Sequence, residues 1–156
     1  MATYSWPYVI GDVLTAANMN SIGAWTAFTP SWTNVTSTSP SNSGQYCLLN
    51  DTLFFRAQYV VGTSPTISAI KLTVPFSQVM AGSPTPQLLP SMQCNFIKLL
   101  SQPYVGQVLY STSTLIELRA INTAGTYAQT TTTTSAIPFT WAQFDTIEVS
   151  GFVQVT

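Results

Sequence analysis

Histidine is absent from this sequence of 156 residues, which therefore holds no Ser-His-Asp triad, no Cys-His pair and no imidazole metal ligand. The two cysteines, Cys47 and Cys94, show no metal-ligand spacing. Because each lies within an apolar run typical of a strand, we expect buried free thiols rather than a disulfide. The missing groups exclude most nucleophilic and metal-assisted chemistry.

Carboxylates are also scarce, with five Asp and Glu residues scattered along the chain. Asp145 and Glu148 are the closest pair, but residues three apart on a strand point to opposite faces of a sheet, so the two cannot share a substrate. Glu117 and Arg119 share a face, and we predict a surface ion pair that contributes little to stability. We predict that the protein is not an enzyme and binds no cofactor and no metal.

Charged residues in general are also scarce. Charged residues make up 6% of the chain and the net charge is -1, whereas a soluble domain usually has about a quarter charged residues. No basic stripe is present to bind nucleic acid or an anionic membrane. A nearly neutral surface of Ser, Thr, Asn and Gln is typical of a subunit packed among copies of itself, and a secreted domain with a polar coat is the alternative. No signal peptide is recognisable, and no apolar run reaches the ~20 residues of a membrane span.

Period-two alternation of apolar and polar residues dominates what is present. The pattern predicts half-buried strands at 52–61, 66–74, 113–121 and 145–155, with weaker ones at 44–49, 92–100 and 104–110. The predicted inward residues are Leu53, Phe55, Ala57, Tyr59, Val61, Ile70, Leu72, Val74, Ile116, Leu118, Ala120, Ile147, Val149, Val153 and Val155. About seven or eight short strands without intervening helices predict an all-β domain, an antiparallel β-sandwich or jelly roll. The threonine run 130–134 is expected as an extended edge or loop, and 83–90 as a long loop.

A single stretch, 9–25, has the pattern of a helix. Thr15 can serve as N-cap, Leu14 can pack on Met19 as a hydrophobic staple, and Gly23 can end the helix after about two turns. So short a helix is marginal in water, so it must lean on its own domain or on another chain. We therefore divide the chain into an N-terminal attachment arm with one short helix, 1–24, and a β-sandwich domain, 25–156.

Aromatic residues flank this helix and recur on the predicted strands. The candidate attachment residues are Trp6, Tyr8, Val13, Leu14, Met19, Ile22 and Trp25. Rings on a sheet surface can stack on sugars, which makes Trp32, Tyr104 and Trp141 candidate glycan contacts. The alternative is that the rings close the ends of the sandwich or fill a subunit interface.

Several segments in order carry a resemblance that covers nearly the whole chain. They are W6, GDVLTAANMN (11–20), FTPSW (28–32), GQYCLLNDTLFFRAQYVVG (44–62), LTVP (72–75) and IPFTWAQFDTIEVSGFV (137–153). This order resembles small β-sandwich virion proteins of tailed bacteriophages, of the minor tail or head-decoration type, as in phages of actinobacteria. The loop after Trp32, NVTSTSPSNSG, departs from the Gly-Asn-Gly turn of many relatives. The resemblance implies a passive, oligomeric and often trimeric part of the particle, exposed to the outside.

We predict a surface-exposed capsid decoration protein, because a compact body with a clamping arm suits that role. It would sit on the virion surface after synthesis in the host cytoplasm. Its predicted partners are copies of itself, as a homotrimer, and other virion proteins such as the major capsid protein or tail proteins. The alternative is a tail-fibre or minor tail protein that binds a cell-wall carbohydrate of the host, although no shaft-forming repeat is present.

Overall fold

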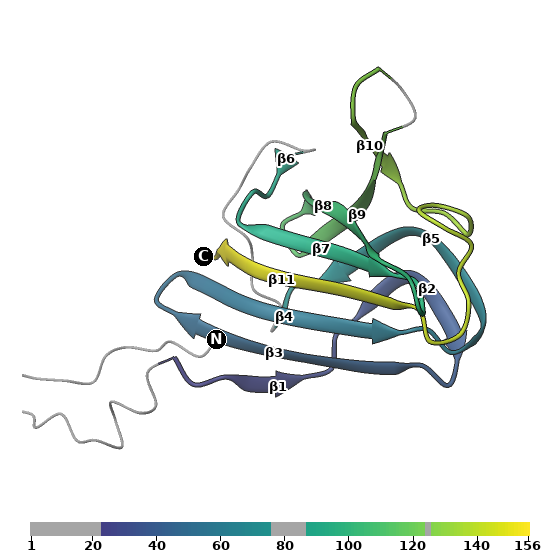
Figure 1. Cartoon of the computed structure of the whole chain (residues 1–156). Helices are drawn as coiled ribbons and strands as arrows, with labels where there is room; N and C mark the ends of the chain where they lie inside the picture. The colour runs from purple at the N-terminus through teal and green to yellow at the C-terminus, as the bar shows by residue number, and fades with distance from the viewer. Residues whose placement is uncertain (1–22, 76–86, 124–125) are drawn as a thin grey trace, which may run out of the picture.

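A computed structural model of the chain describes residues 23–75, 87–123 and 126–156 and shows an antiparallel all-β fold (Figure 1). The described residues form β1 (Thr26–Phe28), β2 (Trp32–Thr38), β3 (Ser41–Leu49), β4 (Thr52–Val60), β5 (Thr63–Thr73), β6 (Gln87–Leu88), β7 (Met92–Ile97), β8 (Pro103–Thr112), β9 (Leu115–Asn122), β10 (Gln129–Thr132) and β11 (Thr146–Gln154). The helix predicted within 9–25 and nearly all of the arm 1–24 lie outside the described residues, as does the first half of the loop 83–90.

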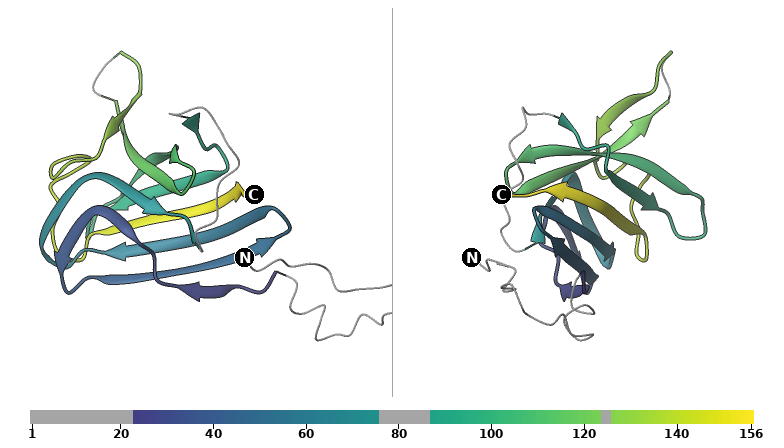
Figure 2. Two further views of the ribbon diagram at one scale, coloured as in Figure 1. Left: turned by 180° about the vertical axis from the view of Figure 1, so that it is seen from behind. Right: turned by 90° about the vertical axis from the view of Figure 1, so that its left-hand side faces the viewer.

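The strands join into one sheet that curls strongly. The strand order is β1-β3-β4-β11-β7-β8-β9-β5-β2, with β10 added to β9 and β6 to β8. Strands β1, β3, β4, β11 and β7 form one wall, and the left view of Figure 2, seen from behind, shows β2 (purple) and β5 (teal) arching in front of this wall to make a half-barrel. The predicted all-β antiparallel class is confirmed. The strands form a single hydrogen-bonded sheet, whereas a sandwich divides them between two.

The curl brings the edge strand β2 against the far wall. The rings of Trp32 and Tyr59 pack edge to face with centroids 6.0 Å apart, and the Tyr59 hydroxyl lies 3.0 Å from Ser37 Oγ. The indole N–H of Trp32 donates to Asn42 Oδ1 at 3.0 Å. At the β4–β5 corner, the N–H of Gly62 donates to Ser37 Oγ at 2.9 Å, and any Cβ at this position would collide with the Thr38 carbonyl. Glycine therefore lets β2 close over the core.

The core fills the concave face, where alternate residues of each strand point. Every inward residue predicted from the sequence is buried, with exposed fractions of 5% or less. Three aromatic rings of this core pack together. The ring centroid of Trp141 lies 4.6 Å from that of Phe139 and 5.9 Å from that of Phe96. Phe139 and Trp141 thus belong to the core cluster, and the expectation that aromatic rings close the ends of the domain or fill a subunit interface stays a prediction.

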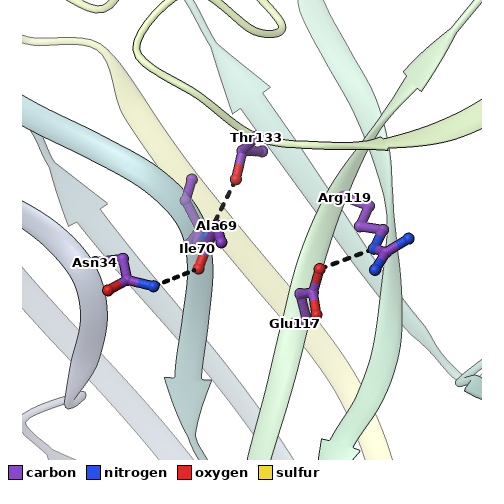
Figure 3. A network of polar contacts seen from close by, with 6 residues as sticks. All are labelled: Asn34, Ala69, Ile70, Glu117, Arg119 and Thr133. Atoms are coloured by element: carbon purple, nitrogen blue, oxygen red, sulfur yellow. Dashed lines mark hydrogen bonds and ion pairs between the residues drawn. The ribbon is translucent and has the colours of Figure 1, made fainter. Parts of the chain in front are cut away.

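The threonine run 130–134 contributes an edge strand, as predicted, and a buried side chain. β10 pairs with β9, and beyond it Thr133 is fully buried. The hydroxyl of Thr133 accepts a hydrogen bond from the Ile70 N–H at 3.0 Å, which joins this segment to β5 (Figure 3). Close by, Asn34 bulges out of β2 with a positive φ of 63° and donates its side-chain N–H to the Ala69 carbonyl at 3.1 Å.

Candidate functional site

The outer face of the wall, opposite the core, carries an open furrow of about 610 Å³ across β1, β3, β4, β11 and β7. Its polar side chains stand in two neighbouring cross-strand rows. One row is Ser43, Gln58, Glu148 and Asn95, and the other is Gln45, Arg56, Ser150 and Gln93. We call this surface the outer furrow. Its volume lies within the range of about 300–1,000 Å³ typical of ligand sites.

Strand alternation explains why these side chains face outward. In β4, Phe55, Ala57 and Tyr59 point into the core, so Arg56 and Gln58 between them must point out. The same alternation in β11 sends Val149 inward and its neighbours outward. Antiparallel registry then places Gln58 directly opposite Glu148 and Arg56 opposite Ser150. The furrow is thus the polar side of strands whose apolar side makes the core.

Each charged side chain of the furrow is hydrogen-bonded to the amide of a glutamine side chain. Arg56 donates from Nε and Nη2 to the side-chain oxygen of Gln45, with the Nε bond at 3.1 Å. Glu148 Oε1 accepts a hydrogen bond from Gln58 Nε2 at 2.9 Å. Among the described residues, the amide nitrogen of Gln45, the amide oxygen of Gln58 and the second oxygen of Glu148 make no further side-chain hydrogen bond. The two charged side chains are of opposite sign, so the furrow carries no net charge.

Four further polar side chains of the furrow offer their full hydrogen-bonding capacity. Ser43, Gln93, Asn95 and Ser150 make no side-chain hydrogen bond to any described residue. Gln93 and Asn95 alternate on β7 beside β11, so their amides project from the same face. Together with the Arg56–Gln45 and Gln58–Glu148 pairs, they present donors and acceptors over four neighbouring strands.

Aromatic rings border one end of the furrow. Trp25 is 51% exposed, and the guanidinium carbon of Arg56 lies 5.6 Å from its ring centroid, a cation–π contact. Beyond Arg56 on the same face, Phe54 and Phe152 pack with centroids 5.5 Å apart, and Phe152 is 42% exposed. An apolar patch of side chains therefore adjoins the polar rows.

The residues predicted from the sequence as attachment or glycan contacts fall in different places. Trp6, Tyr8, Val13, Leu14, Met19 and Ile22 lie outside the described residues, and Trp25 borders the furrow. Trp32 is half-buried against Tyr59, and Tyr104 is exposed beside Phe139 with ring centroids 5.2 Å apart. Trp141 is buried, and its indole N–H donates to the Thr134 carbonyl at 3.0 Å. The structure does not bring Trp32, Tyr104 and Trp141 together on the outer furrow.

Two carboxylates outside the furrow, Asp145 and Glu117, make local structural contacts. Asp145 is buried and accepts backbone N–H groups of Leu99 at 2.9 Å and Ala142 at 2.7 Å, which ties two loops to the start of β11. The predicted ion pair is confirmed, with Arg119 Nε 2.8 Å from Glu117 Oε1 (Figure 3). Within the described ranges, no group of three or more His, Cys, Asp or Glu side chains is placed to hold a metal ion.

Both cysteines are buried free thiols, as predicted. Cys94 lies in the core, where burial raises the pKa of its thiol to about 12 despite a hydrogen bond with the backbone of Gly106 that lowers it. Cys47 points to the outer face of the sheet, because it pairs with Phe54, whose side chain points outward. Gly23 lies close to Cys47, since a Cβ added at Gly23 would be 3.8 Å from the sulfur. The described chain thus begins on the outer face.

No helix of the described residues is long and apolar enough to cross a membrane. Comparison with protein-family models, with curated proteins and with solved structures finds no match to this chain.

Proposed function

We propose that the protein is a non-enzymatic structural subunit of a tailed bacteriophage particle, a capsid decoration protein attached through residues 1–24. The observation that carries this proposal is the place where the arm joins the body. Gly23 lies over Cys47 on the outer face, Trp25 follows with half of its surface exposed, and the next strand, β1, is an edge of the sheet. An arm that joins the body on the outer face can contact a neighbouring chain without disturbing the packing of the core.

The body also suits this role. In our proposal the curled sheet is a jelly-roll-like body, and the buried hydrophobic side chains of the described residues form one cluster. A surface with 6% charged residues favours close packing with identical copies, and we propose a homotrimer on the virion surface. The order of motifs, which resembles that of phage virion proteins, supports the same proposal.

Immunogold labelling of intact particles of the phage that encodes this chain tests the location. We expect gold over the head, as decoration requires. Gold at the tail tip would favour the tail-fibre or minor tail assignment instead. Particles without gold, alongside positive labelling of the major capsid protein as a control, would overturn the proposal that the chain is a virion component.

Deletion of residues 1–24 tests the arm. We expect the truncated chain to retain its unfolding transition, because the core cluster is intact, and to lose attachment to particles that lack the native protein. A full-length Gln143→Ala variant, altered at an exposed loop position, serves as control and should attach normally. Loss of folding on truncation would instead make the arm part of the core, and continued attachment would contradict the role of the arm.

The oligomeric state is tested by light scattering at micromolar concentration. We expect the mass of three chains, because an almost uncharged polar surface offers little repulsion between copies. A stable monomer would contradict the homotrimer, while leaving the gold-labelling test unaffected.

One observation favours the second candidate, a tail-fibre or minor tail protein that binds a cell-wall carbohydrate. The outer furrow presents the amides of Gln93 and Asn95 and two serine hydroxyls, which have no side-chain partner among the described residues, near an exposed tryptophan, and a purely structural subunit does not need such groups. Gold at the tail tip together with binding of a host polysaccharide would establish this candidate.

A further inference from the structure

We propose that the outer furrow is a binding site for a neutral polysaccharide. The site differs from the rings that the sequence alone indicated as glycan contacts, since Trp25 is the aromatic residue at its border. Such a site could serve on the head or on the tail, so failure of carbohydrate binding and failure of the proposed location are separate results.

Amide side chains are concentrated in the furrow. Three of the ten glutamines of the chain, Gln45, Gln58 and Gln93, line it together with Asn95. An amide both donates and accepts hydrogen bonds, as does each hydroxyl of a sugar, so a row of amides can match a row of hydroxyls in either direction. Ser43 and Ser150 add hydroxyls to the same two rows.

Two of these amides are already fixed in place. Gln45 accepts from the guanidinium of Arg56, and Gln58 donates to the Glu148 carboxylate at 2.9 Å. Glu148 and Gln58 are half-buried within the wall, so their rotamers are restricted before any ligand arrives. A ligand that binds these groups therefore loses less of its affinity to the ordering of side chains.

The charge balance selects a neutral ligand. Arg56 and Glu148 have opposite signs, and each is paired with an amide rather than with the other. A polyanion such as nucleic acid needs several unpaired Lys or Arg side chains, and the furrow has none. A protein partner would bury an apolar centre, whereas here the centre is polar and the apolar side chains stand at one end.

Trp25 supplies the apolar contact that a sugar ring needs. Half of the side chain is exposed, and Arg56 beneath it holds the indole at the border of the furrow. The C–H face of a sugar can stack on this ring while its hydroxyls reach the amides of the furrow. Because the furrow is open to solvent, it suits a polysaccharide chain lying across the strands better than an enclosed monosaccharide.

Binding of full-length protein to two probes tests the proposal: an array of neutral and acidic oligosaccharides, and the neutral polysaccharide fraction of the host envelope. We expect binding to at least one neutral probe. Trp25→Ala and Asn95→Ala should each weaken that binding by about tenfold, because each removes one contact worth roughly that factor. Circular dichroism and thermal unfolding confirm that the variants are folded.

Matched controls distinguish the furrow from the rest of the surface. Gln143→Ala removes an exposed glutamine outside the furrow, and Tyr127→Ala removes an exposed ring outside it. Both should bind like the wild type. Failure of the wild type to bind any neutral probe, binding confined to acidic probes, or equal losses in the furrow and control variants would each overturn the proposal. If Asn95→Ala does not fold, Gln93→Ala takes its place in the same comparison.

Discussion

Two neighbouring phenylalanines of β4 point to opposite faces of one sheet and have different surroundings. Phe55 is 1% exposed in the core, whereas Phe54 packs beside Phe152 on the outer face. Apolar side chains from the strands around the core pack together on the inner face. The outer face of the same strands carries polar rows in which several hydrogen-bonding groups have no partner among the described residues. The apolar contacts that stabilise the fold therefore lie on the inner face, and the outer face carries the polar groups that our proposal assigns to a ligand.

The largest expected difference between the faces concerns the two thiols. Burial raises the pKa of the core thiol Cys94 to about 12, which lowers its thiolate population near pH 8 by about a thousandfold relative to an ordinary cysteine. In native protein treated with iodoacetamide at pH 8 and mapped by mass spectrometry, Cys47 should be labelled first and Cys94 only on unfolding. Equal labelling of both in denaturant is the control.

The same shift sets a pH dependence. The folded-state pKa of Cys94 lies above its unfolded value of about 9.0, so its contribution to stability is complete below about pH 9.0 and is lost as pH rises toward 12. Labelling of native Cys94 as fast as Cys47 at pH 8 would contradict the dry environment that we assign to the core between β7 and β8.

The phenylalanine pair gives the next largest effect. Phe55→Ala should lower the free energy of unfolding by about 3–5 kcal/mol, because it leaves a cavity in a fully packed core. Phe54→Ala should cost about 1–2 kcal/mol, chiefly the lost contact with Phe152. Urea denaturation measures both. Equal losses in the free energy of unfolding would mean that the outer face is also covered in solution, which would contradict the difference between the two faces.

A single buried hydrogen bond should cost less than a core ring. Thr133→Val keeps the shape of a fully buried side chain but removes the acceptor of the Ile70 N–H, so we expect a loss of about 1–3 kcal/mol. Thr132→Val, at the half-buried neighbouring position, should stay within about 0.5 kcal/mol. Hydrogen exchange at the Ile70 amide should accelerate only in the first variant. An unchanged exchange rate would show that another group accepts this bond.

Local patterns in the sequence predict the inner face well. Alternation depends only on neighbours along the chain, so β4 and β11 and their inward residues follow directly from it. The outer furrow depends instead on which strands become neighbours. Gln58 and Glu148 are 90 residues apart, and nothing in either segment specifies that they pair.

The curl of the sheet is equally non-local. Periodicity predicts strands and their buried sides, but not the corner at Gly62 where β2 closes over the core. The sequence likewise shows that Asp145 and Glu148 point apart, but the role of Asp145 in holding the Leu99 and Ala142 amides requires two loops to meet. Such roles follow from the strand order and could not be predicted from composition or spacing.

The smallest expected effect is on the outer face itself. Glu148→Gln keeps the length of the side chain and its acceptor for Gln58 while removing the negative charge. The free energy of unfolding should change by less than about 0.5 kcal/mol, as at other surface positions. Because a neutral ligand interacts little with the lost charge, its affinity should change by less than about threefold, since the new amide can still bind a hydroxyl. Binding of acidic oligosaccharides should rise, because Arg56 then stands without an opposing charge. A loss of neutral binding above tenfold would show that the carboxylate itself is a required ligand contact, and the furrow would then select by charge as well as by hydrogen bonding.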